Sequence, residues 1–155
     1  MAKELNVGDN APTLALPDQS GEPVSLKDFT GKQVVLYFYP KDDTPGCTQE
    51  SCDFRDAMAS IKKIGAVILG VSLDGKESHK KFIKKFDLPF PLLSDEEATV
   101  SKAYGCYKEK NMYGRKYWGI ERSTFVIDHA GKLKAIFRKV KVGSHVDDVL
   151  LALKA

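Results

Sequence analysis

Two continuous apolar runs place the strongest constraint on the fold. Val34–Tyr39 (VVLYFY) and Ala66–Leu73 (AVILGVSL) consist mostly of β-branched, aromatic and aliphatic residues, and they lack a regular alternation with polar residues. Runs of this kind are typical of strands that are buried on both faces of a sheet. We therefore expect a sheet whose two central strands are covered on both sides by other elements.

The segments between and after these strands have the spacing of helices. Apolar residues of the segment 47–64 recur at intervals of three and four, which predicts one long helix with an apolar stripe. Gly65 is a plausible C-terminal stop for that helix. Further helices are predicted over Lys76–Phe86, Ala98–Tyr104 and Val146–Leu153.

The remaining segments complete an α/β pattern. The sequence predicts an N-terminal hairpin (Ala11–Leu16 with Pro23–Leu26), a short strand or loop at Leu92–Ser94, a polar loop over Lys108–Trp118, and a hairpin of Ser123–Ile127 with Leu133–Val140. Strands that alternate with helices and end in a hairpin and a helix predict a thioredoxin-like fold, with a central mixed β-sheet flanked by helices. At 155 residues, we expect one domain over 1–155.

Composition excludes several classes of function. The net charge of +3 is spread along the chain, so no nucleic-acid groove is expected. No apolar run approaches the ~20 residues that span a bilayer, and no signal peptide is visible, so no membrane partner is expected. Three cysteines, an odd count, do not suggest a secreted disulfide framework. We expect a cytoplasmic protein whose thiols are normally reduced.

The stretch PKDDTPGCTQESC, from Pro40 to Cys52, places two cysteines five residues apart. On one helix, a rise of ~1.5 Å per residue separates the Cα atoms of Cys47 and Cys52 by ~7.5 Å along the axis alone. A disulfide requires Cα atoms ~4.4–6.8 Å apart. The two cysteines can therefore react with each other only if the first turns of the helix unwind.

The predicted position of Cys47 favours a reactive thiol. A cysteine at a helix N-terminus lies at the positive end of the helix dipole, near unpaired backbone N–H groups. Both features stabilise a thiolate, which is the nucleophilic form. The alternative is that Cys47 is only a small packed residue, although the Pro-Gly turn before it argues for an accessible helix N-terminus.

These residues resemble a known family. Pro40, Thr44 and Cys47 match Pro-x-x-x-Thr-x-x-Cys, the active-site motif of peroxiredoxins, and the string PKDDTPGCTQESCDFRD resembles the bacterioferritin comigratory protein, or peroxiredoxin Q, group. The segment GIERSTFVID is similar to the part of that group that carries the active-site arginine, which falls on Arg122. The opening VGDNAPTLALPDQSGEPVSLKDFTGKQVVLYFYP also matches in order and content.

The resemblance implies a thiol peroxidase, specifically a thioredoxin-dependent, atypical two-cysteine peroxiredoxin. Cys47 would be the peroxidatic residue that attacks a hydroperoxide and becomes a sulfenic acid. Arg122 would stabilise the thiolate and the charge on the leaving oxygen, Thr44 would orient thiolate and peroxide, and Pro40 would shield the thiolate from water. Cys52 would resolve the sulfenic acid as a Cys47–Cys52 disulfide.

The resemblance also implies partners. A hydroperoxide would be the substrate, and thioredoxin or a similar dithiol would reduce the disulfide. No metal or organic cofactor would be needed. The disulfide lies within one chain, which permits a monomer but does not forbid a dimer, and the sequence does not distinguish small from lipid-like peroxides.

Several alternatives stay open at this stage. Cys106 is either a second resolving thiol or a packed cysteine. Glu50 is either a partner of Arg122 or a surface carboxylate, and His79 and His145 are expected to pack or to cap helices rather than bind metal. A thioredoxin-like oxidoreductase would need Cys-x-x-Cys, which is lacking, and a metal-binding module would need close pairs of ligands. A non-enzymatic redox sensor could use the same two cysteines.

Overall fold

The computed structural model describes residues 4–155 of the chain. Residues 1–3 lie outside the described part, and the expectation that the chain has no signal peptide falls partly on them. The strands are β1 (Ala15–Pro17), β2 (Pro23–Ser25), β3 (Gln33–Phe38), β4 (Ala66–Ser72), β5 (Leu92–Ser94), β6 (Tyr107–Met112), β7 (Arg115–Ile120), β8 (Ser123–Ile127) and β9 (Leu133–Phe137). The helices are η1 (Leu26–Phe29), α1 (Pro45–Asp56), α2 (Met58–Ile64), α3 (Lys76–Phe86), α4 (Thr99–Ala103) and α5 (His145–Lys154).

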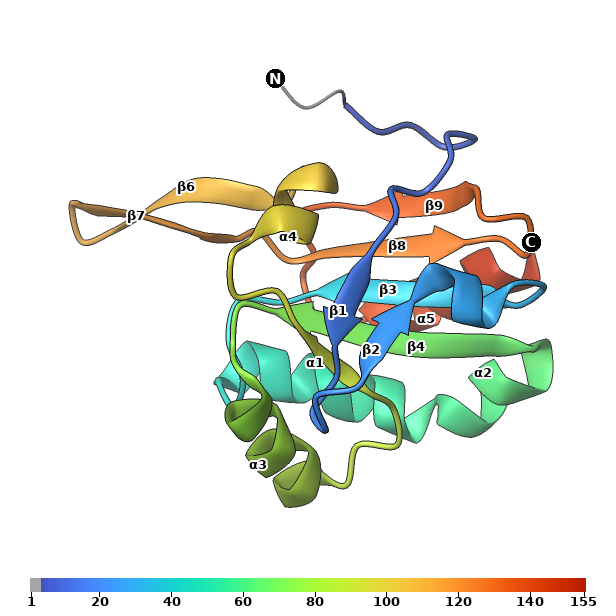
Figure 1. Cartoon of the computed structure of the whole chain (residues 1–155), viewed down its shortest axis with the longest axis horizontal. Coiled ribbons are helices and arrows are strands. Elements are labelled where there is room, and N and C mark those ends of the chain that lie inside the picture. Colours follow the sequence, from blue (N-terminus) through green and yellow to red (C-terminus); the bar gives the residue numbers. More distant parts are fainter. Residues whose placement is uncertain (1–3) are drawn as a thin grey trace.

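A five-stranded mixed sheet lies at the centre of the molecule (Figure 1), with the strand order β5-β4-β3-β8-β9. Strands β3, β4 and β5 are parallel to one another, whereas β8 is antiparallel to both β3 and β9. Strands β1 and β2 pair in a separate N-terminal hairpin, which crosses in front of β3 and β4 in Figure 1. The mixed sheet and the N-terminal hairpin confirm the fold class predicted from the sequence.

Strand β3 contributes to two cores, one on each face of the sheet. Val35 and Tyr37 belong to a cluster that contains residues of α1, α2, α3 and α5. Val34, Leu36 and Phe38 belong to a second cluster, with residues of the N-terminal segment and α4. Because successive side chains of a strand point to opposite faces, both faces need apolar residues. This explains the unbroken apolar run from which β3 was predicted.

The predicted helix over 47–64 is wrong in two respects. The first helix begins at Pro45, because proline suits the first helical position, where its missing N–H is not needed. The chain then forms two helices rather than one, with a break at Ala57 (φ −91°, ψ 0°). The amide of Ala57 contacts the carbonyl oxygens of both Asp53 (3.1 Å) and Phe54 (3.2 Å), as is common at helix ends. The apolar stripe continues across this break, so its spacing did not reveal it.

The predicted polar loop over Lys108–Trp118 is also wrong, because the segment forms the β6–β7 hairpin that projects at the left of Figure 1. Its two turn residues, Tyr113 (φ 53°) and Gly114 (φ 79°), both have positive φ, as type I′ turns require. The hairpin is largely exposed, so it lacks the apolar alternation of a half-buried strand. A stacked pair of rings, Tyr107 and Trp118, joins the two strands (centroids 5.6 Å apart).

The other predicted elements are present with small shifts of their ends. The strand at Leu92–Ser94 is formed, and the helix over Lys76–Phe86 has the predicted bounds. Strand β9 ends at Phe137 instead of Val140, because Lys139 adopts the left-handed conformation (φ 49°) and interrupts the extended backbone.

We predict that the close packing around Gly70 makes it intolerant of a side chain. A Cβ atom there would lie 2.6 Å from Leu92 Cδ2 and 2.9 Å from Tyr37 Cζ, in the middle of the sheet. Overpacking of this kind costs about 1–3 kcal/mol, so Gly70→Ala should lower the free energy of unfolding by that amount. Urea denaturation measures it, and Gly143→Ala, whose Cβ would meet no heavy atom within 4 Å, is the control. Equal midpoints for the two variants would contradict the prediction.

Candidate active site

The loop after β3 leads directly into the first turn of α1, which carries Cys47. Thr44 is the N-cap residue with extended backbone, and its carbonyl oxygen accepts from Thr48 N (2.8 Å). The Thr44 hydroxyl does not cap the helix but donates to the carbonyl oxygen of Lys41 (2.8 Å). Cys47 is the third residue of the helix and is 1% exposed. Its thiol therefore lies at the positive end of the helix, as the sequence predicted, but it is buried.

Strand pairing brings Arg122 to this helix turn. In the antiparallel pair β3–β8, Phe38 at the end of β3 lies opposite Ser123 at the start of β8. Arg122, which precedes Ser123, is thereby placed beside the loop that begins after β3. Its Nη2 donates to Cys47 Sγ (3.3 Å) and its Nη1 donates to Glu50 Oε1 (2.7 Å). One guanidinium thus joins two side chains of α1 from a point more than 70 residues away in the sequence.

Gly46 leaves the space that the guanidinium occupies. A Cβ atom on Gly46 would lie 3.1 Å from Arg122 Nη2, the atom that donates to Cys47. Sequence analysis treated Gly46 only as part of a turn and missed this role. The glycine directly before Cys47 was the available signal in the sequence. Glycine is common where another group approaches the backbone closely.

Glu50 is fully buried and contacts Arg122. It is therefore a partner of Arg122 and not a surface carboxylate. Burial raises the pKa of Glu50 to about 7, and the attraction of Arg122 only partly offsets this effect. Burial acts to lower the pKa of Arg122, but Glu50 and Cys47 together hold it above its ordinary value. The second carboxylate oxygen, Glu50 Oε2, has no hydrogen-bond partner among the described residues.

His145, the first residue of α5, lies on the far side of Glu50. Its Nε2 is 3.9 Å from Glu50 Oε2 and 2.8 Å from Thr124 Oγ1, which is within hydrogen-bonding distance. Burial lowers the pKa of His145 to about 4, so the ring is neutral at neutral pH. The ring also meets Phe54 and Phe137 edge-on, in agreement with the expected packing role.

The structure does not bring Cys52 to Cys47. Both thiols are free, and both lie on the continuous helix α1, Cys52 being half-buried. Five residues of helix separate their Cα atoms by ~7.5 Å along the axis, so no disulfide is possible in this conformation. The structure is therefore that of a reduced, folded α1.

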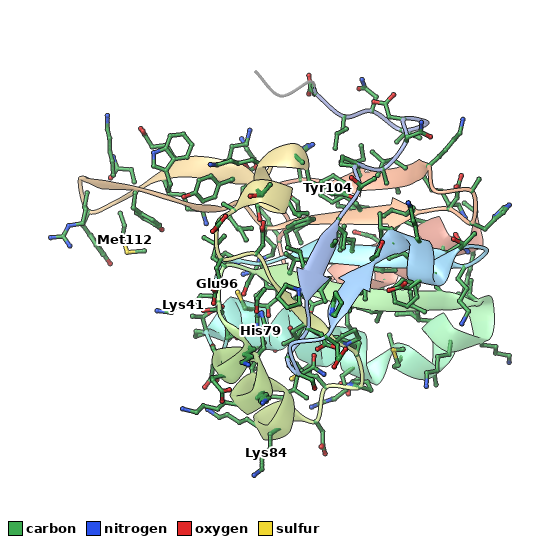
Figure 2. All side chains as sticks on the ribbon, viewed as in Figure 1. Lys41, His79, Lys84, Glu96, Tyr104 and Met112 are labelled. Atoms are coloured by element: carbon green, nitrogen blue, oxygen red, sulfur yellow. The ribbon has the colours of Figure 1, made fainter. Side chains whose placement is uncertain are left out.

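A buried network fixes the loop between Pro40 and Thr44. Asp42 accepts hydrogen bonds from Tyr39 OH (2.5 Å) and Ser78 Oγ (2.8 Å). His79 Nδ1 lies 2.7 Å from Asp42 Oδ2, and its Nε2 lies 3.0 Å from the carbonyl oxygen of Leu93. Asp42 thus ties the loop directly to α3, and His79, which Figure 2 labels, connects it to β5 and has a packing role as expected. Pro40 itself follows β3 and is half-buried.

Cys106 lies apart from the other two cysteines. It belongs to the cluster on the second face of the sheet, whereas Cys47 belongs to the cluster on the first. Burial raises the pKa of its thiol to about 12, and its Sγ lies 3.5 Å from the carbonyl oxygen of Ser101. Of the two alternatives for Cys106, these observations favour the packed cysteine, because thiolate is the reactive form.

Apart from this site, the described residues contain a large cavity, but no candidate metal site and no membrane-spanning helix. A cavity of about 1210 Å³ lies under the N-terminal hairpin, but none of the five predicted site residues lines it. Within residues 4–155, no three His, Cys, Asp or Glu side chains are grouped closely enough to hold a metal ion. In the same range, every helix is too short or too polar to cross a bilayer.

Comparison with known proteins identifies relatives over nearly the full length of the chain. The model of the AhpC/TSA family matches residues 7–136. The chain is 51% identical to the peroxiredoxin Bcp of Bacillus subtilis over 150 residues, which are 97% of this chain and 96% of the relative. It is 47% identical to the peroxiredoxin Bcp of Escherichia coli, with the same coverage.

Solved structures agree with these relatives. A PrxQ from Xylella fastidiosa superposes with a TM-score of 0.92 at 39% identity, covering 99% of this chain and 98% of that one. A peroxiredoxin Q from Xanthomonas campestris superposes with a TM-score of 0.86 at 47% identity, covering 91% and 89%. These structures confirm the thioredoxin-like peroxiredoxin fold. The chain belongs to the AhpC/TSA family, and within it to the Bcp or peroxiredoxin Q group of thiol peroxidases.

Proposed function

We propose that Cys47 is the peroxidatic residue and that Arg122 activates it. The observation that carries this proposal is the 3.3 Å contact between Arg122 Nη2 and Cys47 Sγ in the first turn of α1. A fixed, charged donor stabilises a thiolate and needs no rearrangement when negative charge develops during the reaction. The chain reduces hydroperoxides in this proposal, and a solved relative from Xanthomonas campestris is described by its alkyl peroxide reduction activity.

The reaction follows from these groups. The Cys47 thiolate attacks one oxygen of the hydroperoxide, the O–O bond breaks, and the sulfur becomes a sulfenic acid. The departing oxygen takes up a proton and leaves as water or an alcohol. Arg122 stabilises the thiolate and the charge on the departing oxygen, Thr44 orients the peroxide with its hydroxyl, and Pro40 keeps water from the thiolate. The Thr44 hydroxyl donates to Lys41 O in the free protein, so its oxygen is free to accept from a bound peroxide.

Resolution requires a change of conformation. We propose that α1 unwinds at its N-terminus, that Cys52 attacks the sulfenic acid, and that water leaves as the Cys47–Cys52 disulfide forms. The separation of the two thiols on an intact helix supports this order, because it prevents the disulfide from forming before unwinding. Thioredoxin or a similar dithiol then reduces the disulfide.

We further propose that residues 1–155 form one domain that acts as a cytoplasmic monomer. Both apolar clusters share the strands of one sheet, which supports a single domain. The proposed disulfide lies within one chain, so no second subunit is needed. Three free cysteines suit a compartment where thiols are kept reduced.

Disulfide mapping after addition of one equivalent of hydrogen peroxide tests these roles. We expect a Cys47–Cys52 bond in the wild type and a Cys47 sulfenic acid in Cys52→Ser, both detected by mass spectrometry. Cys106→Ser should behave like the wild type. A bond from Cys47 to Cys106, or between chains, would overturn the resolving role of Cys52, and an unreacted Cys47 would overturn the peroxidase itself.

A redox sensor is the second candidate function, since it could form the same disulfide once. A peroxidase must turn over, so hydrogen peroxide should be consumed in many-fold excess over protein when a thioredoxin, its reductase and NADPH are supplied. NADPH absorbance follows the reaction. Consumption that stops after about one equivalent per protein would favour the sensor.

The space that Gly46 leaves for Arg122 predicts that a side chain there lowers activity without loss of fold. In Gly46→Ala, the new methyl group displaces Nη2 from Cys47, and a displaced donor should lower the rate constant for sulfenic acid formation by roughly tenfold or more. Rapid mixing with hydrogen peroxide, followed by intrinsic fluorescence, measures this step. Gly143→Ala, in open space, is the matched control. An unchanged rate in Gly46→Ala would show that the guanidinium position is not critical.

A further inference from the structure

The site holds one hydrogen-bonded cation between two groups that can each carry a negative charge. Arg122 donates to Cys47 through Nη2 and to Glu50 through Nη1. Both partners are buried, Cys47 at 1% and Glu50 at 0% exposure. A thiolate and a carboxylate together would leave one negative charge without compensation by this guanidinium. Burial makes an uncompensated charge costly, so the two groups are expected to avoid being ionised together.

The carboxyl group of Glu50 has one oxygen that suits a proton. Oε1 accepts from Arg122, whereas Oε2 is buried without a hydrogen-bond partner among the described residues. The nearest nitrogen, His145 Nε2, is 3.9 Å away and lies within hydrogen-bonding distance of Thr124 instead. An ionised carboxylate with an unpartnered oxygen is unfavourable in such a place, and a proton on Oε2 removes the charge.

Among the groups around the site whose pKa is shifted, Glu50 is the one whose pKa lies near neutral pH. Burial lowers the pKa of His145 to about 4 and raises that of Tyr37 well above its ordinary value, so both stay neutral. The pKa of Glu50 is raised to about 7. The charged groups that act on Glu50 are Asp53 on the same helix and Arg122 before β8. Asp148 on α5 acts on His145, and Lys110 on β6 interacts with Cys47, Arg122 and Glu121.

We propose that Glu50 takes up a proton when Cys47 ionises, so that Arg122 faces a single anion in both the resting and the reactive state of the site. In the resting thiol state that anion is the Glu50 carboxylate. In the reactive state it is the Cys47 thiolate, and Glu50 is a neutral carboxylic acid. This inference rests on the proposed function of Cys47 and adds a second role to Glu50 beyond contact with Arg122.

The protons and electrons balance through the peroxidase step. Ionisation moves one proton from Cys47 Sγ to Glu50 Oε2 in net terms. The thiolate electron pair then forms the S–O bond, and the O–O electron pair leaves with the departing oxygen. That oxygen gains one proton and Glu50 loses one, so thiol and hydroperoxide give sulfenic acid and water or alcohol. The neutral sulfenic acid leaves the Glu50 carboxylate as the anion that faces Arg122.

Carbon-13 NMR of protein labelled at the glutamate carboxyl carbon tests this sharing directly. Glu50→Gln identifies the Glu50 resonance by its loss, and thiolate absorbance reports Cys47 in the same samples. We expect Glu50 in the wild type to lose its proton at a pH at least about one unit higher than in Cys47→Ser, where no thiolate competes. One unit corresponds to a tenfold coupling, within the usual range for linked sites. Equal midpoints in the two proteins would overturn the proposal.

Linkage provides a second and independent measurement. Coupling between two sites is reciprocal, so the thiolate titration of Glu50→Gln should shift to lower pH by the same amount. Glu121→Gln removes the same charge one residue before Arg122, and it should leave the midpoint unchanged. A shift only in Glu50→Gln supports proton sharing, and a shift of the same size in both variants would assign it to general charge and overturn the proposal.

The two proposals fail in different ways. If Cys47 reacts with peroxide but Glu50 titrates independently of it, the peroxidase stands and the shared proton is wrong. If Cys47 forms no thiolate and does not react, the proposed function fails and the shared proton fails with it.

Discussion

The contact of the Arg122 guanidinium with the first turn of α1 is the interaction on which the site depends. It requires β8 to begin beside the end of β3, a glycine before Cys47, and a carboxylate one turn further along the helix. Each of these features has a separate cause in the sequence, and only the folded sheet brings them together. A guanidinium suits this place because its planar nitrogens donate to two partners at once. An ammonium group has three donors on one atom, but it lacks the fixed planar fork that places two donors on separate nitrogens.

The sheet and the loop before α1 hold Arg122 and the start of the helix independently of the first helical turn. Two contacts hold the backbone of Arg122. The next residue, Ser123, pairs with Phe38 of β3, and the carbonyl oxygen of Arg122 accepts from Val140 N (3.0 Å). The loop that leads into α1 is held by Asp42 and His79, which are both buried. The first turn of α1 lacks one common constraint, because the Thr44 side chain does not cap it. A rigid frame around a less constrained turn suits a thiol that is first aligned and then released.

The buried strands were predicted from the sequence, whereas the exposed β6–β7 hairpin, the break at Ala57 and the role of Gly46 were missed. The run Val34–Tyr39 predicted β3 because both of its faces are apolar, and the fold class followed from the order of such runs. The β6–β7 hairpin was missed because its side chains are mostly exposed and carry no apolar period. Motifs located Cys47 and Arg122, but the need for Gly46 became visible only with the guanidinium in place. Pairwise contacts between distant segments depend on register, which local sequence does not encode.

The break at Ala57 limits how much structure the proposed unwinding of α1 must disrupt. Helix α1 has 12 residues and α2 has 7, and the main apolar anchor of α2, Ile61, is fully buried on the far side of the break. A single helix of the predicted length would have to open against that anchor. In the proposed resolving step, the break lets the first turns of α1 unwind while α2 stays packed, because local unfolding can occur at a free-energy cost below that of the whole domain. The irregular backbone at one alanine thus allows the proposed unwinding of α1 without loss of the buried packing of α2.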